Sequence, residues 1–364
     1  MKKIIAVSVV RNESDIIESW CRYLCSYCDQ VLIHDDNSTD STKDILLALV
    51  ANGLSISFSE EFLTLEYDEY RLPQTRISNQ LIKLAFETLG ADIAFVADAD
   101  EFVTTVDGSS PRDILEQLDA AIEYRALWRT YVCDNKLTQN CKFLPDFFSS
   151  YRNPLLEKFG KVFILRKLYE EYQGRLTDGN HSLAYSNPRK TPTVQYRDDL
   201  IIAHYPIRSA DQLITKVVNG WFSYLASPNH TEGRGFHWEK IYRQIKMLGE
   251  LDEQVVANES LRYALQDGIV QEELLQTVAG KLRTDFIKEP IRLSYTDYNR
   301  REKDGLRRIL ENTEQLIKFL MEKQKQCMRT AEDVGSEIAQ LKKTLSWRIT
   351  KPLRMVGNLL RKKV

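Results

Sequence analysis

The chain lacks most of the features that mark membrane, secreted or nucleic-acid-binding proteins. No apolar run approaches the roughly 20 residues that span a bilayer. Only six of the 364 residues are cysteines, too few for a disulfide scaffold at this length. The 50 Lys and Arg nearly balance the 52 Asp and Glu, so no overall field would collect nucleic acid. The apolar run before Arg11 is too short for a secretory signal, and we expect a cytoplasmic protein with reduced cysteines.

What the chain does contain is enough apolar material for a large core, with 43% hydrophobic and 10% aromatic residues. Its first hundred residues alternate short β-branched runs with segments of helical period. This alternation is typical of a mostly parallel sheet flanked by crossover helices, so we expect an α/β fold. The predicted strands are 3–10, 30–34, 54–59 and 92–97, and the predicted helices are 13–27, one from 41, and 73–89.

The second half of the chain has a different pattern. We expect β-rich segments at 126–132, 160–166, 181–185 and 200–204, a helix at 209–225, and only helices and connectors beyond Phe236. The predicted organisation is an α/β domain at 1–235, a helical extension at 236–305, a long amphipathic helix at 306–341 and a basic tail at 342–364.

Acidic residues gather where the fourth predicted strand ends. Asp98 and Asp100 are two residues apart, so an extended backbone would point both side chains to one face. Two carboxylates on one face can hold Mn²⁺ or Mg²⁺ with open positions for phosphate oxygens. Glu101 adds a third carboxylate, and unpaired acids this close repel one another, which favours a bound cation. An isolated Asp-x-Asp triplet is more often a solvated strand end, but the buried run Ile93 to Ala97 before it favours the metal.

Several motifs, in order along the chain, resemble bacterial family-two glycosyltransferases with the GT-A fold. The likeness is strongest to the branch whose metal motif reads Asp-x-Asp-Glu-Phe, and it covers about the first 225 residues. The matching residues are VVRNE at 9–13, IHDDNSTD at 33–40, Gln80, FVADADEF at 95–102, AHYPIRS at 203–209 and Lys216.

The resemblance implies a GT-A-like (Rossmann-like) sheet and transfer of a sugar from a nucleotide-diphosphate sugar to an acceptor hydroxyl, with inversion. It also suggests a saccharide or lipid-linked acceptor in surface glycan assembly, such as lipopolysaccharide or capsule. Asp98 and Asp100 would hold the metal, with His204 as a further ligand. The implied nucleotide-sugar site consists of Arg11, Asn12, Glu13, Asp35, Asp36, Arg208 and Lys216, the last two facing the phosphates.

The catalytic base is the least defined part of the site. An inverting transfer needs a carboxylate or histidine to accept the proton of the acceptor hydroxyl. Asp146, Glu157, Asp178 and His181 lie in the right stretch, and Gly179 to Ser182 resembles a Gly-x-His segment of the same branch, which favours His181 and Asp178. Asp178-Gly179 is also what a simple turn would contain. His204, for its part, could be a core histidine bonded to a carbonyl.

Three cysteines offer a competing interpretation. Cys21, Cys25 and Cys28 have the spacing of radical S-adenosylmethionine enzymes, in which three thiolates hold an iron-sulfur cluster. The same cysteines fall among the apolar positions of the predicted helix 13–27, where a free cysteine behaves as a small hydrophobic residue. Spacing without context is a weak signal, so we favour the packing interpretation.

The C-terminal part suggests further partners. Residues 342–364 carry eight Lys or Arg and no acid, interleaved with apolar residues, which favours contact with an anionic membrane surface over a solvated or partner-binding helix end. The stripe at 306–345 would suit a homo-oligomer or a non-enzymatic coiled-coil interaction protein. A nucleotidyltransferase is a further alternative, but Arg11 to Ser14 lacks the glycine-rich phosphate loop expected of one.

Overall fold

The computed structural model describes residues 1–61, 74–133, 142–187, 189–226, 236–248, 251–265 and 272–297, with single residues at 313, 320 and 329. Apart from these three, the predicted helix at 306–341 and the basic tail at 342–364 lie outside the described residues.

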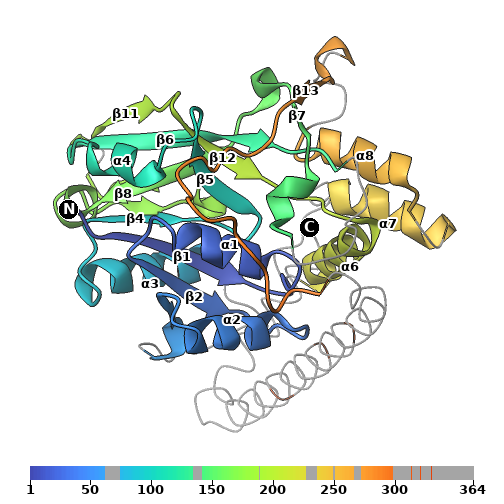
Figure 1. Ribbon diagram of the computed structural model, residues 1–364, viewed down its shortest axis with the longest axis horizontal. Coiled ribbons are helices and arrows are strands. Elements are labelled where there is room, and N and C mark those ends of the chain that lie inside the picture. The colour runs from blue at the N-terminus through green and yellow to red at the C-terminus, as the bar shows by residue number, and fades with distance from the viewer. Residues whose placement is uncertain are drawn as a thin grey trace, which may run out of the picture.

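A mixed β-sheet forms the centre of the molecule, as Figure 1 shows. Its strand order is β3-β2-β1-β4-β8-β6-β12-β5, and β11 pairs with β6 outside this path. β1 to β4 are parallel to one another, whereas β8 is antiparallel to β4 and β6, and β5 is antiparallel to β12. The bounds are β1 Ile4–Val10, β2 Gln30–Asp35, β3 Ile56–Phe58, β4 Ile93–Val96, β5 Glu101–Thr105, β6 Ile122–Thr130, β8 Gly160–Leu165, β11 Thr193–Tyr196 and β12 Leu200–His204.

The helices of the first hundred residues pack on the parallel half of this sheet. α1 (Ile17–Leu24) contacts α2 (Thr42–Ala51) and β5, and α3 (Gln74–Glu87) contacts β1, β2 and β4. The strands β1, β2 and β4 are almost wholly buried because helices or chain cover both faces, and this explains their continuous apolar sequences. The α/β prediction is confirmed, with strands close to the predicted bounds. The short helices α4 (Pro111–Glu116) and α5 (Arg166–Glu170) were not predicted.

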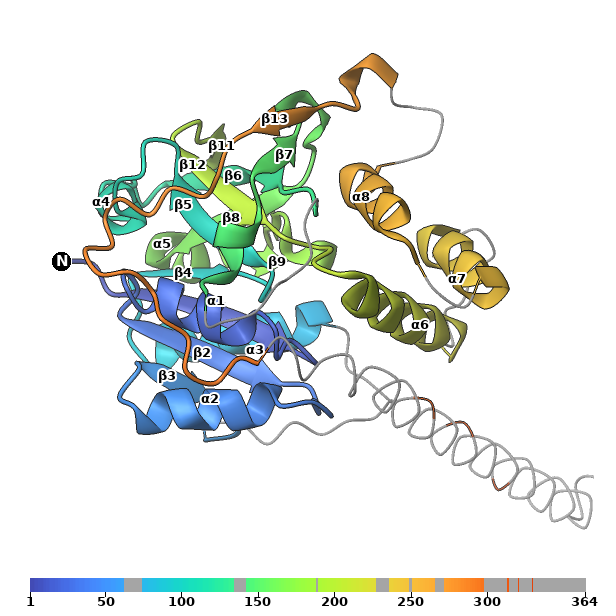
Figure 2. The same cartoon turned by 45° about the vertical axis from the view of Figure 1, so that its right-hand side comes forward.

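The last described part of the chain returns to the sheet. After α6 (Ala210–Ala226), α7 (Phe236–Leu248) and α8 (Glu253–Arg262), β13 (Thr277–Ala279) pairs with β7 (Ser150–Arg152). The prediction of only helices and connectors beyond Phe236 is therefore wrong at β13, a strand too short for its alternation to be visible. Residues 281–297 then run back along the sheet domain, as the orange trace in Figure 2 shows.

A buried carboxylate fastens this returning segment. Glu18 of α1 is fully buried and accepts the backbone N–H groups of Ser294, Tyr295 and Thr296 at 2.7, 2.8 and 2.8 Å. Arg22 pairs with the same carboxylate at 2.9 Å. Helix α1 therefore carries both core side chains and the anchor of a segment about 276 residues away in sequence.

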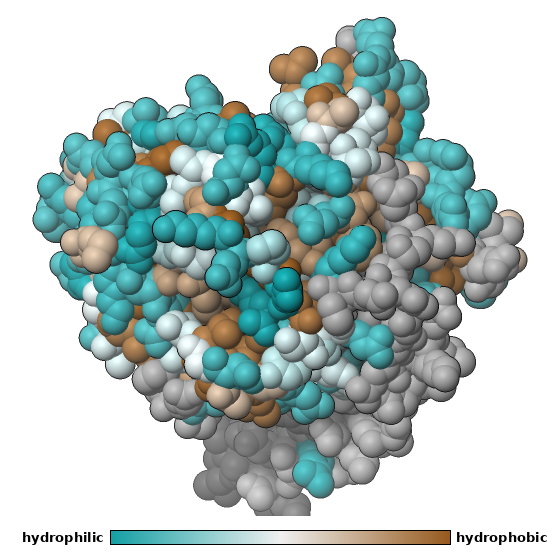
Figure 3. Space-filling model, in the orientation of Figure 1, coloured by the Kyte–Doolittle hydropathy of each residue, from teal (hydrophilic) through white to brown (hydrophobic). Residues whose placement is uncertain are grey.

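The remaining described elements are short. They are η1 Ser59–Glu61, η2 Leu144–Phe147, η3 Pro154–Leu156, β9 Arg175–Leu176, η4 Asp178–Asn180, β10 Leu183–Ala184 and η5 Glu272–Leu274. On the face drawn in Figure 3, hydrophilic residues are interspersed with smaller hydrophobic patches. Among the described helices, none has both the length and the apolar character needed to cross a bilayer.

Candidate functional site

The acidic motif lies in a tight turn between two strands that are consecutive in the chain but separated by β8, β6 and β12 in the sheet. β4 ends at Val96 and β5 begins at Glu101, and the N–H of Glu101 donates to the carbonyl of Asp98 at 2.9 Å. The sequence predicts Asp98 and Asp100 on one face of an extended strand. That prediction is wrong because the chain turns between them, and each carboxylate meets a different set of cations.

Asp98 shares a lysine with the third acid of the motif. Nζ of Lys161, on β8, lies 2.9 Å from Oδ2 of Asp98 and 3.1 Å from Oε2 of Glu101. Burial opposes the charge of the Lys161 ammonium, but Asp98 and Glu101 together raise its pKa above the usual range. Oδ1 of Asp98 accepts from Gln74 Nε2 at 3.0 Å, and the Asp98 side chain is 33% exposed.

Glu101 has no exposed surface and is held by three donors. Its Oε1 accepts from Trp128 Nε1 at 2.8 Å, and its Oε2 accepts from the backbone N–H of Asp98 at 2.9 Å and faces Lys161. Burial raises the pKa of Glu101, Lys161 opposes that rise, and the nearby Asp98 and Asp100 add to it. Three donors and no exposure make Glu101 a fixed part of the site's framework.

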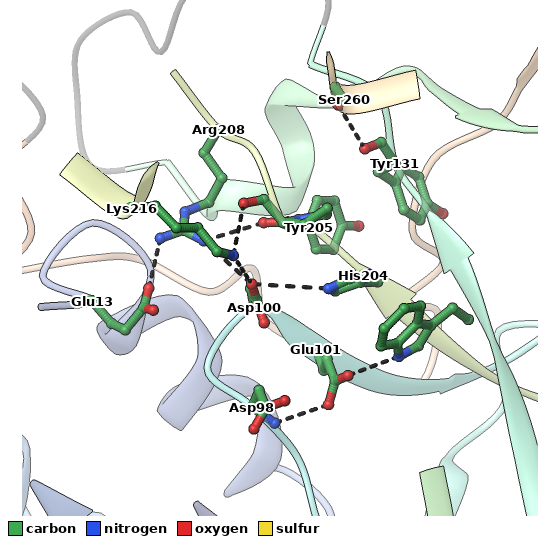
Figure 4. Close-up of polar contacts among 12 residues, drawn as sticks. Glu13, Asp98, Asp100, Glu101, Tyr131, His204, Tyr205, Arg208, Lys216 and Ser260 are labelled. Carbon is green, nitrogen blue, oxygen red and sulfur yellow. Dashed lines mark hydrogen bonds and ion pairs between the residues drawn. The ribbon is translucent and has the colours of Figure 1, made fainter. Parts of the chain in front are cut away.

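Asp100 faces a second group of basic side chains, two cations and a histidine. Lys216 Nζ lies 3.1 Å from Asp100 Oδ2, and His204 Nε2 and Arg208 Nη1 each lie 3.9 Å from the same oxygen. Figure 4 shows Lys216 and His204 approaching Asp100 from different directions. Burial alone would raise the pKa of Asp100, but Lys216, His204 and Arg208 hold it well below its usual range. Asp100 is therefore ionised at neutral pH.

Arg208 ties the site to the loop after β1. Its guanidinium is 1% exposed and makes a two-pronged pair with Asp15, and it also contacts Glu13 Oε2 at 2.6 Å. Burial raises the pKa of Glu13 and Arg208 opposes that rise. The resemblance implies that Arg208 faces phosphates, whereas the structure directs its guanidinium to carboxylates. Lys216, with 30% of its side chain exposed, is the more accessible cation.

His204 is buried yet weakly engaged. Its ring stacks on Trp128 at 4.2 Å between centroids, and within the described part of the chain its Nδ1 has no hydrogen-bond partner. The 3.9 Å from Nε2 to Asp100 is too long for a hydrogen bond. Burial lowers the pKa of His204 to about 3, with Asp100 opposing and Lys216 adding to the shift. The imidazole is therefore neutral at neutral pH, the state that binds metals.

These residues fit a divalent cation only in part. Asp100 and the uncommitted His204 face each other at a separation that one ion between them would suit. No group of three or more His, Cys, Asp or Glu among the described residues converges as a metal site, so the predicted set of Asp98, Asp100 and His204 is not assembled. The expectation of unpaired acids is also wrong, because Lys161, Lys216 and Arg208 already neutralise them.

The loops after β1 and β2 lie together, as expected of neighbouring parallel strands. Asn12 has a left-handed backbone with φ of 57°, and its Oδ1 accepts from the N–H of Thr39 at 2.7 Å. Arg11 pairs with Asp36 at 3.7 Å. Asp35 accepts from the N–H of Ser38 at 3.2 Å, while burial raises its pKa. Four of the five predicted nucleotide-site residues at these strand ends, Arg11, Asn12, Asp35 and Asp36, are thus brought together at the carboxyl ends of β1 and β2.

His181 is held in one tautomer at the side of the same site. Its Nδ1 lies 2.7 Å from the carbonyl oxygen of Gly160, which can only accept, so Nδ1 carries the proton and Nε2 keeps its lone pair. Its ring meets the edge of Trp128 at 5.4 Å. Burial lowers the pKa of His181, and the Gly160 carbonyl partly opposes this. His181 is therefore a neutral acceptor at neutral pH.

The other candidate bases are placed less favourably. Glu157 is buried and accepts from Arg152 and from the N–H of Thr130, so its oxygens are engaged. Asp146 lies exposed in η2, and partial desolvation raises its pKa. The side chain of Asp178 lies outside the described residues. Its neighbour Gly179 has φ of 78°, and a Cβ there would come within 2.6 Å of the His181 ring.

The structure contradicts the iron-sulfur alternative. Cys21, Cys25 and Cys28 are all described, all free, and take part in no group that could hold a metal ion. Burial, with a contribution from Cys25, raises the pKa of Cys21 and Cys28 well above the usual range. The three thiols are protonated and poor ligands, as expected of packing residues.

Sequence reasoning missed Lys161, Trp128 and Asp15. Lys161 could have been predicted, since a lysine in the otherwise apolar strand Gly160–Leu165 requires a buried partner of opposite charge. No local sequence pattern indicates the roles of Asp15 and Trp128, because their partners are far away in sequence.

Comparisons with known proteins give partial likenesses. No protein-family model and no curated protein matches the chain. Among solved structures, it is similar to glucosyl-3-phosphoglycerate synthase from Mycobacterium tuberculosis in complex with Mn²⁺, UDP and glucosyl-3-phosphoglycerate, with 20% identity and a TM-score of 0.26. The match covers 35% of this chain and 44% of that one, so it spans less than half of that protein.

A second similar structure is a protein from Bacillus anthracis in complex with sucrose, whose name assigns it provisionally to the glucose-1-phosphate thymidylyltransferases. The identity is 10%, the TM-score is 0.30, and the match covers 54% of this chain and 87% of that one. Both likenesses are partial, and the site described above is built from this chain's own residues.

Proposed function

We propose that the protein is a divalent-metal-dependent glycosyltransferase that moves a sugar from a nucleotide-diphosphate sugar to an acceptor hydroxyl. The observation that carries the proposal is the pair of Asp100 and His204, an ionised carboxylate facing a buried, uncommitted imidazole. Asp100 follows β4, at the carboxyl ends of the parallel strands where α/β folds bind ligands, and His204 is the last residue of β12. Mn²⁺ or Mg²⁺ is the proposed metal.

The chain's own residues would divide the work as follows. Arg11, Asn12, Asp35 and Asp36 would bind the nucleoside, because they share the edge formed by the loops after β1 and β2. Lys216 would donate to the diphosphate, since its ammonium is accessible and already faces Asp100. Glu13 and Arg208 would position Asp100 through the buried pairs that join the two loops.

The proposed reaction forms a bond from the acceptor oxygen to the anomeric carbon and breaks the bond from that carbon to the diphosphate oxygen. When bound, the metal would stabilise the negative charge of the departing diphosphate. His181 would accept the proton of the attacking hydroxyl at Nε2, because its Nδ1 proton is fixed on the Gly160 carbonyl. Inversion follows if His181 and the diphosphate lie on opposite sides of the sugar.

A panel of nucleotide sugars tests this proposal. Melting temperatures are compared with and without Mn²⁺ for the wild type and for Asp100→Asn, with exposed Asp119→Asn as a matched control. We expect one sugar nucleotide to stabilise the wild type and Asp119→Asn only when Mn²⁺ is present. Asp100→Asn should lose that response. A wild type that responds to no sugar nucleotide, with or without metal, contradicts the proposal.

We further propose a location on the inner face of the cytoplasmic membrane, through residues 342–364, with an acceptor in surface glycan assembly. The eight basic residues of that stretch support contact with anionic headgroups. Full-length protein should sediment with vesicles containing phosphatidylglycerol but not with phosphatidylcholine vesicles, and a chain ending at residue 341 should stay in solution. Equal sedimentation of both chains contradicts this. Light scattering on the shortened chain would also test a homo-oligomer formed through 306–345.

A further inference from the structure

Lys161 is a buried cation that contacts Asp98, two residues before the Asp100 to which the proposed function assigns a metal ion. Its side chain is 1% exposed and contacts the accessible Asp98 on one side and the fully buried Glu101 on the other. It projects from β8 at a position paired with Ala126 of β6, in the middle of the sheet. A side chain rooted there cannot swing into solvent, so its ammonium stays beside the acidic turn.

We propose that Lys161 is a built-in competitor of the divalent cation for Asp98. In the state described here its ammonium takes Oδ2 of Asp98, and the two acids that would otherwise attract a metal are neutralised. This inference rests on the proposed function, since it assumes that Asp100 and His204 provide the first ligands of the cation. Lys161 would thus be a positioning residue that controls whether Asp98 can reach a cation, and the sequence of the acidic motif does not show this role.

The different exposures of the partners indicate which of them moves. Asp98 is 33% exposed, whereas Lys161 and Glu101 are 1% and 0% exposed. Asp98 can therefore turn away from Lys161 toward a cation, while Lys161 and Glu101 stay in place. Glu101 then remains as the partner of Lys161, so the buried ammonium is never left unpaired. This explains why a third acid, held by Trp128 and the Asp98 backbone, follows the Asp-x-Asp pair.

The competition predicts an order of binding. Metal alone must displace Lys161 from Asp98 without compensation, so it should bind weakly. A diphosphate brings negative charge that the cations of the site can share, so metal and nucleotide together should bind more tightly. Lys161 would thus make the metal site depend on the presence of nucleotide.

The test is a calorimetric titration with Mn²⁺ alone on the purified full-length chain. The variant is Lys161→Met, and the matched control is Lys158→Met, which removes the same charge from an exposed position three residues away. We expect Lys161→Met to bind Mn²⁺ about tenfold or more tightly than the wild type, because one positive charge has left the site. Lys158→Met should match the wild type. The double variant Lys161→Met with Asp98→Asn should lose this gain in Mn²⁺ affinity.

A second variant covers a failure of Lys161→Met to fold. Lys161→Met with Glu101→Gln removes one charge of each sign and keeps an oxygen to accept from Trp128. It should still bind Mn²⁺ more tightly than the wild type, because Asp98 is free. Equal affinity in this variant or in Lys161→Met would overturn the role of Lys161. If the wild type then still binds Mn²⁺ with a nucleotide sugar, the proposed function survives that failure. If neither the wild type nor any variant binds Mn²⁺ in the presence of any nucleotide sugar, both the role of Lys161 and the proposed function are overturned.

Discussion

The two halves of the sheet hold their polar side chains in different ways. In the loops after β1 and β2, polar side chains bond to backbone groups within the same loop or in the adjacent one, as when Asp40 accepts from the N–H of Thr42 and Asn12 from that of Thr39. Around the turn after β4, side chains bond to other side chains far away in sequence. Lys161 and Asp98 are 63 residues apart, and Lys216 and Asp100 are 116 apart. The first half builds a surface that needs few distant contacts, and the second half exists only once the whole sheet has formed.

The comparison predicts that removing a distant buried partner costs the most stability. Arg208→Ala should lower the free energy of unfolding by about 3 to 5 kcal/mol, because it removes the guanidinium that pairs with the buried carboxylate of Asp15. Urea denaturation would measure the loss. Arg243→Ala breaks an exposed guanidinium-carboxylate pair and is the control, with an expected change of about 0.5 kcal/mol or less. Similar losses in the two variants would contradict the greater contribution assigned to buried pairs between distant residues.

The next effect concerns activity. Asp100→Asn should lower the rate of diphosphate release from the donor by about 10² to 10³-fold, because an ionised group facing Lys216 and His204 is replaced by a neutral one. Asp119→Asn should leave the rate unchanged. The measurement is release of nucleoside diphosphate by the purified variants. A rate near the wild-type value in Asp100→Asn would place the chemistry away from this turn.

The pH dependence of the rate tests His181. Because burial lowers its pKa from the ordinary value of about 6.5, the neutral base persists into mildly acidic solution. The rate should rise with pH through a midpoint below 6.5 and stay level above it. His181→Gln should lose this limb and lower the rate by about 10²-fold. An unchanged acid limb in His181→Gln would assign it to another group, Asp146 being the first to examine.

The smallest effect separates backbone strain from a contact with the site. Gly179 and Gly53 have nearly the same left-handed φ, 78° and 83°, but only a Cβ at Gly179 would meet the His181 ring. Alanine at either position should cost about 1 kcal/mol of stability. Only Gly179→Ala should also lower the rate, by about tenfold, since it displaces His181. Equal rates in the two variants would show that the position of His181 does not matter.

The same comparison explains what could be predicted from the sequence. The strands β1, β2 and β4 and helices α1 to α3 follow from apolar runs and helical periodicity, which are local patterns. The acidic and polar clusters could be predicted at the ends of β1, β2 and β4, because ligands of such sheets bind at the carboxyl ends of the strands. The sequence does not predict strand β5, because Asp98 to Phe102 form one acidic motif at the end of the fourth predicted strand.

The partners of the acids could not be predicted in the same way. Lys161, Arg208 and Lys216 reach the acidic turn from three later elements, and no local pattern fixes which acid each one meets. The turn at Asp98 to Glu101 causes the largest difference between the predicted and the observed site. A single hydrogen bond that closes it sends two neighbouring carboxylates to different cations.

Diffraction from crystals grown with Mn²⁺ and a sugar nucleotide tests the central claim most directly. The account predicts an anomalous peak at about 2 Å from a carboxylate oxygen of Asp100 and from Nε2 of His204. Lys161 should remain against Glu101. A manganese peak elsewhere in the chain, or bound nucleotide with no peak beside Asp100, would contradict it.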